Sequence, residues 1–305
     1  MKTPHLVQYQ GSKRLLAPEI IRYFPEDVET LYEPFCGTCA VTILAAQNGL
    51  CREYVVNDIN GPLVGLMKEC IEEPLRLAEA YETIWNGQYE EGTDNIEYFY
   101  KIRKEFNDGQ QDPARMLFLL ARVVKGAVRY NADGTMNQSC DKRRYGTKPA
   151  LIRENAAKIS ELLKGKTTFY SMDYKEIFKK ATPRDLVYMD PPYQGTSNAI
   201  NPRDNRYIAG VQYEEFVEAL YTLNARNIRY IVCYDGRTGD KVIGKDLPED
   251  LNLTHILINA GTSAQATLNG KKETTFESLY FSPGLIRKED EYKQLSIFDI
   301  AGATV

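Results

Sequence analysis

Asp190, Pro191, Pro192 and Tyr193 are the residues of this chain whose types and order are best suited to chemistry. They follow the apolar run 185–189, which is typical of a buried strand. Proline fixes φ and has no amide hydrogen, so the Asp190 and Pro191 carbonyl groups stay available as acceptors. Tyr193 offers a flat ring on which a base can stack. Amino-group methylation requires an exocyclic amino group held in this way, whereas the plainer interpretation is that two prolines end a strand.

A strand–turn–helix–strand unit near the N-terminus predicts a nucleoside site. We expect a strand over Thr30 to Phe35, a small-residue turn over 36–39, a helix from Ala40 to Asn48 and a strand over Tyr54 to Asn57 that closes at Asp58. Such βαβ units bind nucleosides at the carboxyl ends of their strands. Cys39 stands where a dinucleotide fingerprint has its second glycine, so a different nucleotide-related unit or a purely structural one also fits.

The rest of the chain predicts an α/β fold with a mostly helical insertion. Apolar residues recur at helical spacing over Leu15–Tyr23, Leu63–Trp85, Ile96–Phe106, Pro113–Val128 and Ala150–Leu163, and a β-hairpin is expected over 129–137 because Asp133-Gly134 favours a turn. Strand–helix alternation resumes at Thr167–Tyr170 and continues through strand 185–189, a helix at Tyr213–Asn227, a strand at Ile228–Tyr234 and a hairpin that turns near Asn269-Gly270 with 274–281 as its second arm. We therefore predict a nucleoside-binding domain over 1–61 and 166–286, an insertion over 62–165 and a tail over 287–305.

A local basic patch contrasts with the acidic balance of the whole chain, whose formal net charge is −4. Between positions 122 and 148, seven basic residues face two acidic ones. Neutralising phosphates requires such a patch and not a basic average. We expect nucleic-acid contacts from Arg122, Lys125, Arg129, Asn131, Arg143 and Arg144, although a solvated, charged loop also fits the pattern.

The cysteine content and the hydropathy of the chain indicate in which cellular compartment the protein is expected. Six cysteines at irregular spacing indicate reduced thiols in a cytoplasm, no apolar run approaches the length of about 20 residues that spans a membrane, and the first residues lack a signal-peptide core. Cys36 and Cys39 could form a redox pair or half a zinc site, but there is no second pair and only His5 and His255 are available. No metal is expected.

With these motifs in hand, the chain resembles the Dam-type (D12 class, alpha-group) DNA adenine-N6 methyltransferases. The likeness covers most of the chain in the family's motif order: the segment Tyr9 to Lys13, the glycine loop around Gly37, the Asn57–Asn60 motif, Asp173, the Asp190–Tyr193 motif and a helix-plus-hairpin reader from Phe118 to Asn131. The resemblance implies a Rossmann-like S-adenosylmethionine (SAM)-dependent methyltransferase fold with a target-recognition insertion. It also implies methyl transfer to the adenine N6 amino group in duplex DNA after base flipping, with S-adenosylhomocysteine (SAH) as product.

The resemblance assigns roles to single residues. Catalysis falls to Asp190, Pro191, Pro192 and Tyr193, and the SAM contacts fall to Tyr9, Lys13, Glu33, Pro34, Phe35, Gly37, Asp58, Asp173, Tyr174 and Asp190. Asp58 is expected at the ribose hydroxyls and Asp173 at the cofactor's adenine. In the reader, Arg129 and Asn131 are expected at base edges, and Arg143 and Arg144 at phosphates.

Three departures from the family pattern limit which residue roles can be carried over to this chain. Cys36, Thr38 and Cys39 replace the usual small residues of the glycine loop, and the strand around Cys233 lacks the family's serine-asparagine pair. The reader differs enough that base preference does not carry over. The motif identity of Asp190 indicates an adenine amino group, since related enzymes with Ser there act on cytosine and those with Asn act on glutamine or guanine.

A short motif near the end of the chain suggests a protein partner. Residues Gln294 to Phe298, after a charged stretch, resemble the peptide by which bacterial replication proteins dock on the sliding clamp. A cognate restriction endonuclease is a second potential partner, and the protein is expected in the cytoplasm of a bacterium or encoded by a phage.

Three alternatives to the leading hypothesis remain. An enzyme with the same chemistry could act on RNA, which a preference for structured or single-stranded RNA would reveal. A DNA-binding module that has lost catalysis would fail to bind SAM. An NAD-dependent oxidoreductase fits the βαβ unit, but no residues for hydride transfer accompany it.

Overall fold

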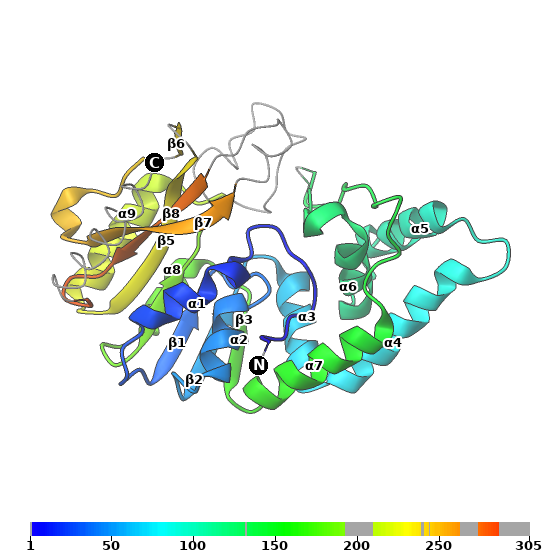
Figure 1. The fold of residues 1–305 in the computed structure, drawn as a ribbon, viewed down its shortest axis with the longest axis horizontal. Helices are drawn as coiled ribbons and strands as arrows, with labels where there is room; N and C mark the ends of the chain where they lie inside the picture. The colour runs from blue at the N-terminus through cyan, green and yellow to red at the C-terminus, as the bar shows by residue number, and fades with distance from the viewer. Residues whose placement is uncertain are drawn as a thin grey trace, which may run out of the picture.

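A twisted sheet with strand order β3-β2-β1-β4-β5-β8-β7 forms the centre of the molecule (Figure 1). The structure is a computed structural model that describes residues 2–131, 133–192, 210–238, 241–243, 245–262 and 274–286. The strands are β1 Thr30–Glu33, β2 Glu53–Asn57, β3 Thr167–Tyr170, β4 Leu186–Met189, β5 Arg229–Thr238, β6 Lys241–Ile243, β7 Thr254–Thr262 and β8 Thr274–Phe281, with β6 paired to β5 outside the main order.

Strand direction and burial follow the sequence pattern. Strands β3, β2, β1, β4 and β5 run parallel, whereas β8 lies antiparallel between β5 and β7. All four residues of β4 are buried, as expected for a parallel strand covered on both faces. The strand order reverses between β1 and β4, so loops at the carboxyl ends of these strands diverge and leave a crevice. The predicted α/β, Rossmann-like fold is confirmed.

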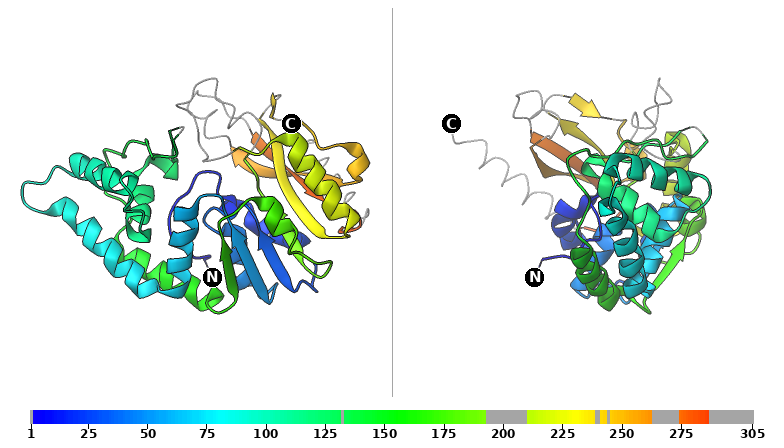
Figure 2. Two further views of the ribbon diagram at one scale, coloured as in Figure 1. Left: turned by 180° about the vertical axis from the view of Figure 1, so that it is seen from behind. Right: turned by 90° about the vertical axis from the view of Figure 1, so that its right-hand side faces the viewer.

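Helices cover both faces of the sheet, as the two opposite views in Figures 1 and 2 show. Helices α8 (Tyr174–Phe178) and α9 (Tyr213–Ala225) pack on one face, where Val187, Met189 and Phe216 lie in one apolar cluster. Helices α1 (Ala17–Ile20) and α2 (Ala40–Gln47) cover the other face, around Leu31 and Ile43. The alternation of strand residues between the two clusters follows from the two-residue period of a strand.

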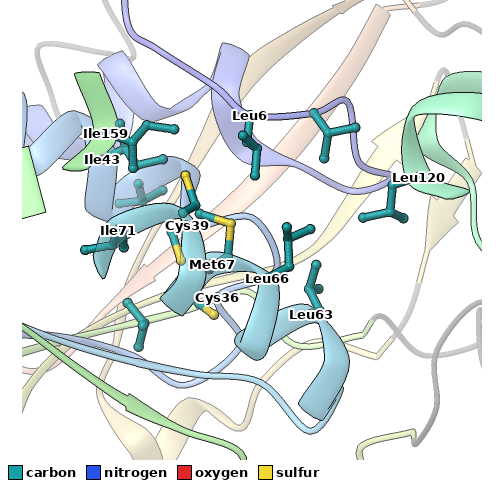
Figure 3. Packing of buried hydrophobic residues seen from close by; sticks show 14 of the residues in the cluster. Leu6, Cys36, Cys39, Ile43, Leu63, Leu66, Met67, Ile71, Leu120 and Ile159 are labelled. Carbon is teal, nitrogen blue, oxygen red and sulfur yellow. The ribbon is translucent and has the colours of Figure 1, made fainter. Parts of the chain in front are cut away.

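Five helices form an insertion between β2 and β3, at the right of Figure 1. They are α3 Gly61–Glu72, α4 Pro74–Asn86, α5 Asn95–Asn107, α6 Pro113–Arg122 and α7 Pro149–Leu163. The core is continuous between the sheet and the insertion, because Ile43 of α2, Met67 of α3 and Ile159 of α7 belong to one apolar cluster. Figure 3 shows Ile43 beside Ile159, and Met67 beside Cys39. The insertion is therefore packed against the sheet's α2 face and shares its core.

Three predicted helices differ in their bounds. The helix expected over Leu63–Trp85 is two helices, because Glu73 precedes Pro74 and takes non-helical angles (φ −134°, ψ 57°). The helix expected over 113–128 ends at Arg122, since Val123 is extended and bridges Cys140. The segment 13–23 consists of α1 between two 3-10 turns. The remaining predicted elements lie within two residues of the observed bounds, apart from strand β5, which extends to Thr238.

The predicted hairpin of the insertion is present as a short turn structure. Asn137 N donates to the Arg129 carbonyl at 2.9 Å, Asn131 N donates to the Thr135 carbonyl at 2.8 Å, and Tyr130 bridges Met136. The pairing consists of isolated bridges in the part of the chain that the structure describes. The antiparallel arms β7 and β8 of the second hairpin are confirmed, but its turn near 269–270 lies outside the described residues, as does the 287–305 tail. Among the described helices, none combines the length and hydropathy of a transmembrane segment.

Candidate active site

A cavity of about 450 Å³ opens at the carboxyl ends of β1, β2, β3 and β4. The loops that follow these strands and the segment 9–16 form its walls. All the residues predicted to contact SAM line it, together with two prolines of the predicted catalytic motif: Tyr9, Lys13, Glu33, Pro34, Phe35, Gly37, Asp58, Asp173, Tyr174, Asp190, Pro191 and Pro192. Tyr193 lies outside the described residues. Among these residues, the structure brings together Tyr9 and Pro192, which are 183 positions apart in the sequence.

Lys13 forms ion pairs with two carboxylates that also line the cavity. Its Nζ lies 2.8 Å from Asp190 Oδ1 and 3.3 Å from Glu277 Oε2, and the three side chains are 8%, 18% and 18% exposed. Burial alone would lower the pKa of Lys13, but Asp190, with Cys233 and Glu277, holds this pKa well above its ordinary value. A buried cation thus sits between the predicted catalytic carboxylate and a second acid from β8.

Asp58 holds the glycine loop in place. Its carboxylate accepts hydrogen bonds from Gly37 N at 3.0 Å and from Asn60 N at 2.9 Å. Burial raises the pKa of Asp58, and these two backbone donors oppose the rise. Gly37 has φ +49°, and a Cβ there would lie 3.4 Å from the Tyr9 ring. The loop therefore approaches the N-terminal segment closely, and Asp58 sits at the end of β2 as the sequence predicted.

Glu33 at the end of β1 fastens the start of α2 to the sheet. Its Oε2 accepts hydrogen bonds from Thr42 N at 3.2 Å and from the Thr42 hydroxyl. Burial raises the pKa of Glu33 to about 8, although the two Thr42 hydrogen bonds lower it. Glu33 therefore has a structural role in addition to lining the cavity.

The raised pKa of Glu33 predicts how stability depends on pH. Between its ordinary value of 4.5 and about 8, the folded protein keeps a proton that the unfolded chain has lost, so stability falls as pH rises through this range. In Glu33→Gln the side chain is neutral over the whole pH range. The variant should therefore lack this loss of unfolding free energy, which is on the order of 4 kcal/mol. Urea unfolding at pH 5 and pH 8.5 measures the difference. Glu26→Gln, an exposed control, should keep the wild-type pH dependence; an unchanged pH dependence in Glu33→Gln would contradict the assignment.

Asn60 joins the cavity to the hairpin of the insertion. Its Nδ2 donates to the Tyr130 hydroxyl at 2.8 Å, while its Oδ1 accepts from Leu63 N at 3.2 Å and caps α3. Tyr130 is buried and lines the cavity between the two exposed residues Arg129 and Asn131. A hydrogen-bonded path thus runs from the glycine loop through Asp58 and Asn60 to the hairpin.

The predicted DNA contacts fall into different environments. Arg129, Arg143 and Arg144 are exposed on the hairpin and the loop after it. Asn131 is exposed too, but its amide donates to Thr135 Oγ1 at 2.8 Å and accepts from Asn137 Nδ2 at 2.7 Å. The amide keeps one further hydrogen and one further oxygen lone pair with which Asn131 could meet a base edge. The side chain of Lys125 lies outside the described residues.

Arg122 is a predicted DNA contact that the structure contradicts. Its side chain is 0% exposed, and its guanidinium donates to Gln88 Oε1 and to Asn95 Oδ1, the latter at 3.0 Å. The guanidinium also lies over the Tyr145 ring, 5.4 Å from its centroid. Arg122 therefore fixes the packing of α6 against the 87–95 segment and the loop at Tyr145, and cannot reach a phosphate without unfolding this part.

Cys36 and Cys39 are buried free thiols within the glycine loop. Their hydrogen bond with each other and burial raise the pKa of Cys36 well above its ordinary value. Cys39 has φ +55°, and its amide donates to the Cys36 carbonyl at 2.7 Å. The residues that the structure describes contain no group of three His, Cys, Asp or Glu side chains arranged to hold a metal. In this structure the pair forms the turn that starts α2.

The cavity residues that sequence reasoning missed include Tyr130, Tyr188 and Glu277. Tyr188 lies in β4 two positions before Asp190, so the strand period placed it on the same face as the predicted catalytic carboxylate. Glu277 is a charged residue within the apolar strand 276–281, which was a usable signal. Tyr130 carried none, because aromatic residues in a hairpin are common.

Comparison with known proteins decides the family. The family model of the D12 class N6 adenine-specific DNA methyltransferases matches residues 9–257. This chain belongs to that family. It is 26% identical over 275 residues to the Type II methyltransferase M1.LlaDCHI of Lactococcus lactis subsp. cremoris, covering 87% of this chain and 91% of that protein. It is 28% identical over 198 residues to the Retron Ec67 DNA adenine methylase of Escherichia coli, covering 63% of this chain and 64% of that one.

Among solved structures, the rRNA methyltransferase AviRa from Streptomyces viridochromogenes matches with a TM-score of 0.36 and 14% identity, over 91% of this chain and 88% of that one. A likeness this distant bears on neither substrate nor mechanism. The family assignment makes this chain an adenine-specific DNA methyltransferase, a class of enzyme that uses SAM.

The cavity lining fits a ligand of the SAM type. The hydroxyls of Tyr174 and Tyr188 are buried in the cavity wall and have no hydrogen-bond partner among the described residues. The aromatic pair Phe35 and Tyr174, with ring centroids 5.2 Å apart, supplies an apolar wall nearby. Carboxylates, hydroxyls and aromatic rings suit a cationic nucleoside.

Proposed function

We propose that this cavity binds SAM together with an adenine flipped out of duplex DNA, and that methyl transfer to N6 takes place beside Asp190. The observation that carries the proposal is the single cavity that joins Asp190, the glycine loop and Asp58 at the switch point of the sheet. Family membership makes adenine in DNA the substrate class. Base flipping follows because the amino group of a stacked, paired base cannot enter a cavity of this kind.

The residues proposed to hold SAM divide between its two ends. Asp58 is proposed to accept from the ribose hydroxyls, and Asp173 from the adenine amino group. Asp173 Oδ1 already accepts from Lys175 N at 2.8 Å as the cap of α8, so its other oxygen would serve the ligand. Phe35 and Tyr174 would flank the adenine ring. The Tyr9–Lys13 segment and the Glu33–Gly37 loop would enclose the methionine end.

Asp190 is proposed to prepare the amino nitrogen for attack. The lone pair of an aromatic amine is delocalised into the ring, which makes the nitrogen a poor nucleophile. If Asp190 and the Pro191 carbonyl accept its two hydrogens, they favour the tetrahedral geometry that attack needs. Tyr193 is proposed to stack on the flipped base. Flipping a base out of the duplex costs a few kcal/mol. SAM would supply the methyl group from its sulfonium, whose sulfur would keep the bonding electrons as the thioether of SAH. The amino nitrogen would lose one proton to solvent as its bond to the methyl carbon forms.

The basic hairpin and the loop after it are proposed to bind the DNA backbone. Arg143 and Arg144 are exposed and lie beside a single acid, Asp141, whose Oδ2 is 3.6 Å from Arg144 Nε. Arg129 extends the same basic stretch toward the cavity through its neighbour Tyr130. The insertion is therefore proposed as the target-recognition domain, and 1–61 with 166–286 as the catalytic domain.

Removing two of these charges should weaken DNA binding independently of sequence. For the double variant Arg143→Gln/Arg144→Gln, the slope of log affinity against log salt should shrink by about 1 to 2, because each phosphate contact contributes about 0.9. Fluorescence anisotropy with a duplex at several salt concentrations measures this slope. Arg184→Gln is a matched control, because Arg184 is exposed at the opposite end of β4. Equal slopes for the double variant and the wild type would contradict the proposed surface.

The substrate class is tested by product analysis. Purified protein is incubated with isotopically labelled SAM and duplex DNA, single-stranded DNA or structured RNA, and the nucleosides are separated by chromatography and mass spectrometry. Labelled N6-methyldeoxyadenosine from duplex DNA is the expected result. Labelled N6-methyladenosine from RNA alone would favour the RNA alternative, whereas no product and no SAM binding would favour a non-catalytic DNA-binding protein.

Partners and location extend the proposal. The relatives come from bacteria and from a bacteriophage, Escherichia phage P1, which supports a cytoplasmic enzyme of a bacterium or phage. One relative is named a Type II methyltransferase, which supports a cognate restriction endonuclease as a partner. Docking on the sliding clamp through Gln294–Phe298 stays a prediction, because these residues lie outside the described part of the chain. Co-purification with each partner tests these two predictions.

A further inference from the structure

Glu277 is a cavity residue with no role in the proposal above. It lies on β8, where Phe281, Leu279 and Glu277 share one face by the strand period. Phe281 and Leu279 are fully buried in the core, so a carboxylate at the next position of this face is unexpected. The pairing of β5 with β8 shifts register between Cys233 and Gly236, opposite Glu277. Bulges of this kind redirect side chains near active sites.

The contacts of Glu277 point toward Asp190. Its Oε2 lies 3.3 Å from Lys13 Nζ and accepts from Cys233 Sγ at 3.1 Å, while the same Lys13 Nζ lies 2.8 Å from Asp190 Oδ1. All four side chains are buried or nearly so. Removing one member of such a buried charge group leaves the others unbalanced. Lys13 is thus the shared partner of two acids, one directly after β4 and one on β8.

We propose that Glu277 is a positioning residue for methyl transfer, because it shares the Lys13 ammonium with Asp190 and keeps the Asp190 carboxylate available to accept hydrogens from the substrate amino group. This inference rests on the proposed function. Lys13 holds Asp190 in place, but a lysine engaged with Asp190 alone would occupy more of its acceptor capacity. The second acid draws the ammonium partly away. Glu277 therefore acts through Lys13 and makes no contact with the reacting atoms.

The direct test is Glu277→Gln, which keeps the size of the side chain and removes its charge. Single-turnover methyl transfer to duplex DNA should slow by about 10- to 100-fold, whereas the Kd for SAH, measured by calorimetry, should change by less than about 3-fold. SAH is a suitable probe because it lacks the sulfonium charge. Glu277→Asp keeps the charge and should recover part of the rate. Glu176→Gln, exposed on α8, is the matched control and should keep the wild-type rate.

A double-mutant cycle separates this role from a merely structural one. In the Lys13→Met background, Glu277→Gln should cause little further loss of rate, because the path through Lys13 is already broken. An equal loss in both backgrounds would overturn the inference. So would a normal rate in Glu277→Gln, or a loss of SAH binding that accounts for the slower transfer. An inactive wild-type protein would overturn the proposed function as well, whereas an active wild type with a normal Glu277→Gln variant would overturn the role of Glu277 alone.

Discussion

Asp190→Asn should lower the rate of methyl transfer at least about 1,000-fold, which corresponds to about 4 kcal/mol of transition-state stabilisation. The variant keeps the shape of the side chain but places an amide donor where the substrate amino group needs an acceptor. Lys13 keeps its contact with Glu277, so the cavity should stay assembled. Binding of SAH should therefore weaken far less than the rate falls. Single-turnover kinetics with saturating SAM and duplex DNA, together with calorimetry for SAH, give the two numbers.

Asp185→Asn is the matched control for this prediction. Asp185 flanks the same strand at its other end, where its carboxylate accepts from Thr30 N at 3.1 Å and from Thr182 N at 2.8 Å. Loss of this charge should lower the melting temperature and leave the rate within about 3-fold of wild type. A rate for Asp190→Asn within about 10-fold of wild type would contradict the central role of Asp190.

Gly126→Ala should displace the N-terminal segment and weaken both folding and SAH binding. Gly126 has φ +64°, and a Cβ built there would lie 2.0 Å from the Gln8 carbonyl oxygen and 2.8 Å from Tyr9 Cα. Both are backbone atoms, so no side-chain rotation relieves the collision. Gln10 N also donates to the Gly126 carbonyl at 3.1 Å. Because Tyr9 and Lys13 follow this segment into the cavity, SAH affinity should fall at least about 10-fold.

Gly49→Ala is a control that measures the cost of left-handed backbone angles in alanine without any steric collision. Gly49 has φ +65°, but no atom lies within 4 Å of the position that its Cβ would take. Left-handed backbone angles cost alanine about 1–2 kcal/mol at either site. The additional loss of stability in Gly126→Ala therefore measures the cost of displacing the N-terminal segment. Urea unfolding should show at least about 2 kcal/mol more destabilisation for Gly126→Ala. Equal losses for the two variants, with normal SAH binding, would show that the segment adapts without cost.

The framework of the cavity could be predicted from the sequence because it depends on short-range patterns. The loops that form the cavity walls each follow a buried strand, and parallel strands have their carboxyl ends at the same edge of the sheet. Glu33, Asp58 and Asp190 are therefore expected to lie close together. Most helix bounds were predictable for the same reason. Pro74, however, divides one continuous apolar pattern, and the helices expected over 113–128 and 15–23 are shorter than predicted.

Long-range pairing could not be predicted in this way. Arg122 belongs to a run of basic residues, but whether it is exposed depends on Gln88 and Asn95, which lie 34 and 27 positions upstream. Glu277 reaches Lys13 only because of the register of β8 on β5, which a one-residue shift would reverse. The contact of Gly126 with Gln8 likewise joins distant segments. The sequence shows which residues are charged, but strand register and the packing of distant segments determine which partners they contact.

The most direct test of the central claim is base-resolved sequencing that detects methyladenine in unmethylated duplex DNA after incubation with SAM, using the wild type and Asp190→Asn side by side. N6-methyladenine at one short motif with the wild type, and none with the variant, is the predicted result. An unmethylated duplex after incubation with wild-type protein that binds SAM would contradict the claim, as would methyladenine deposited equally by the variant.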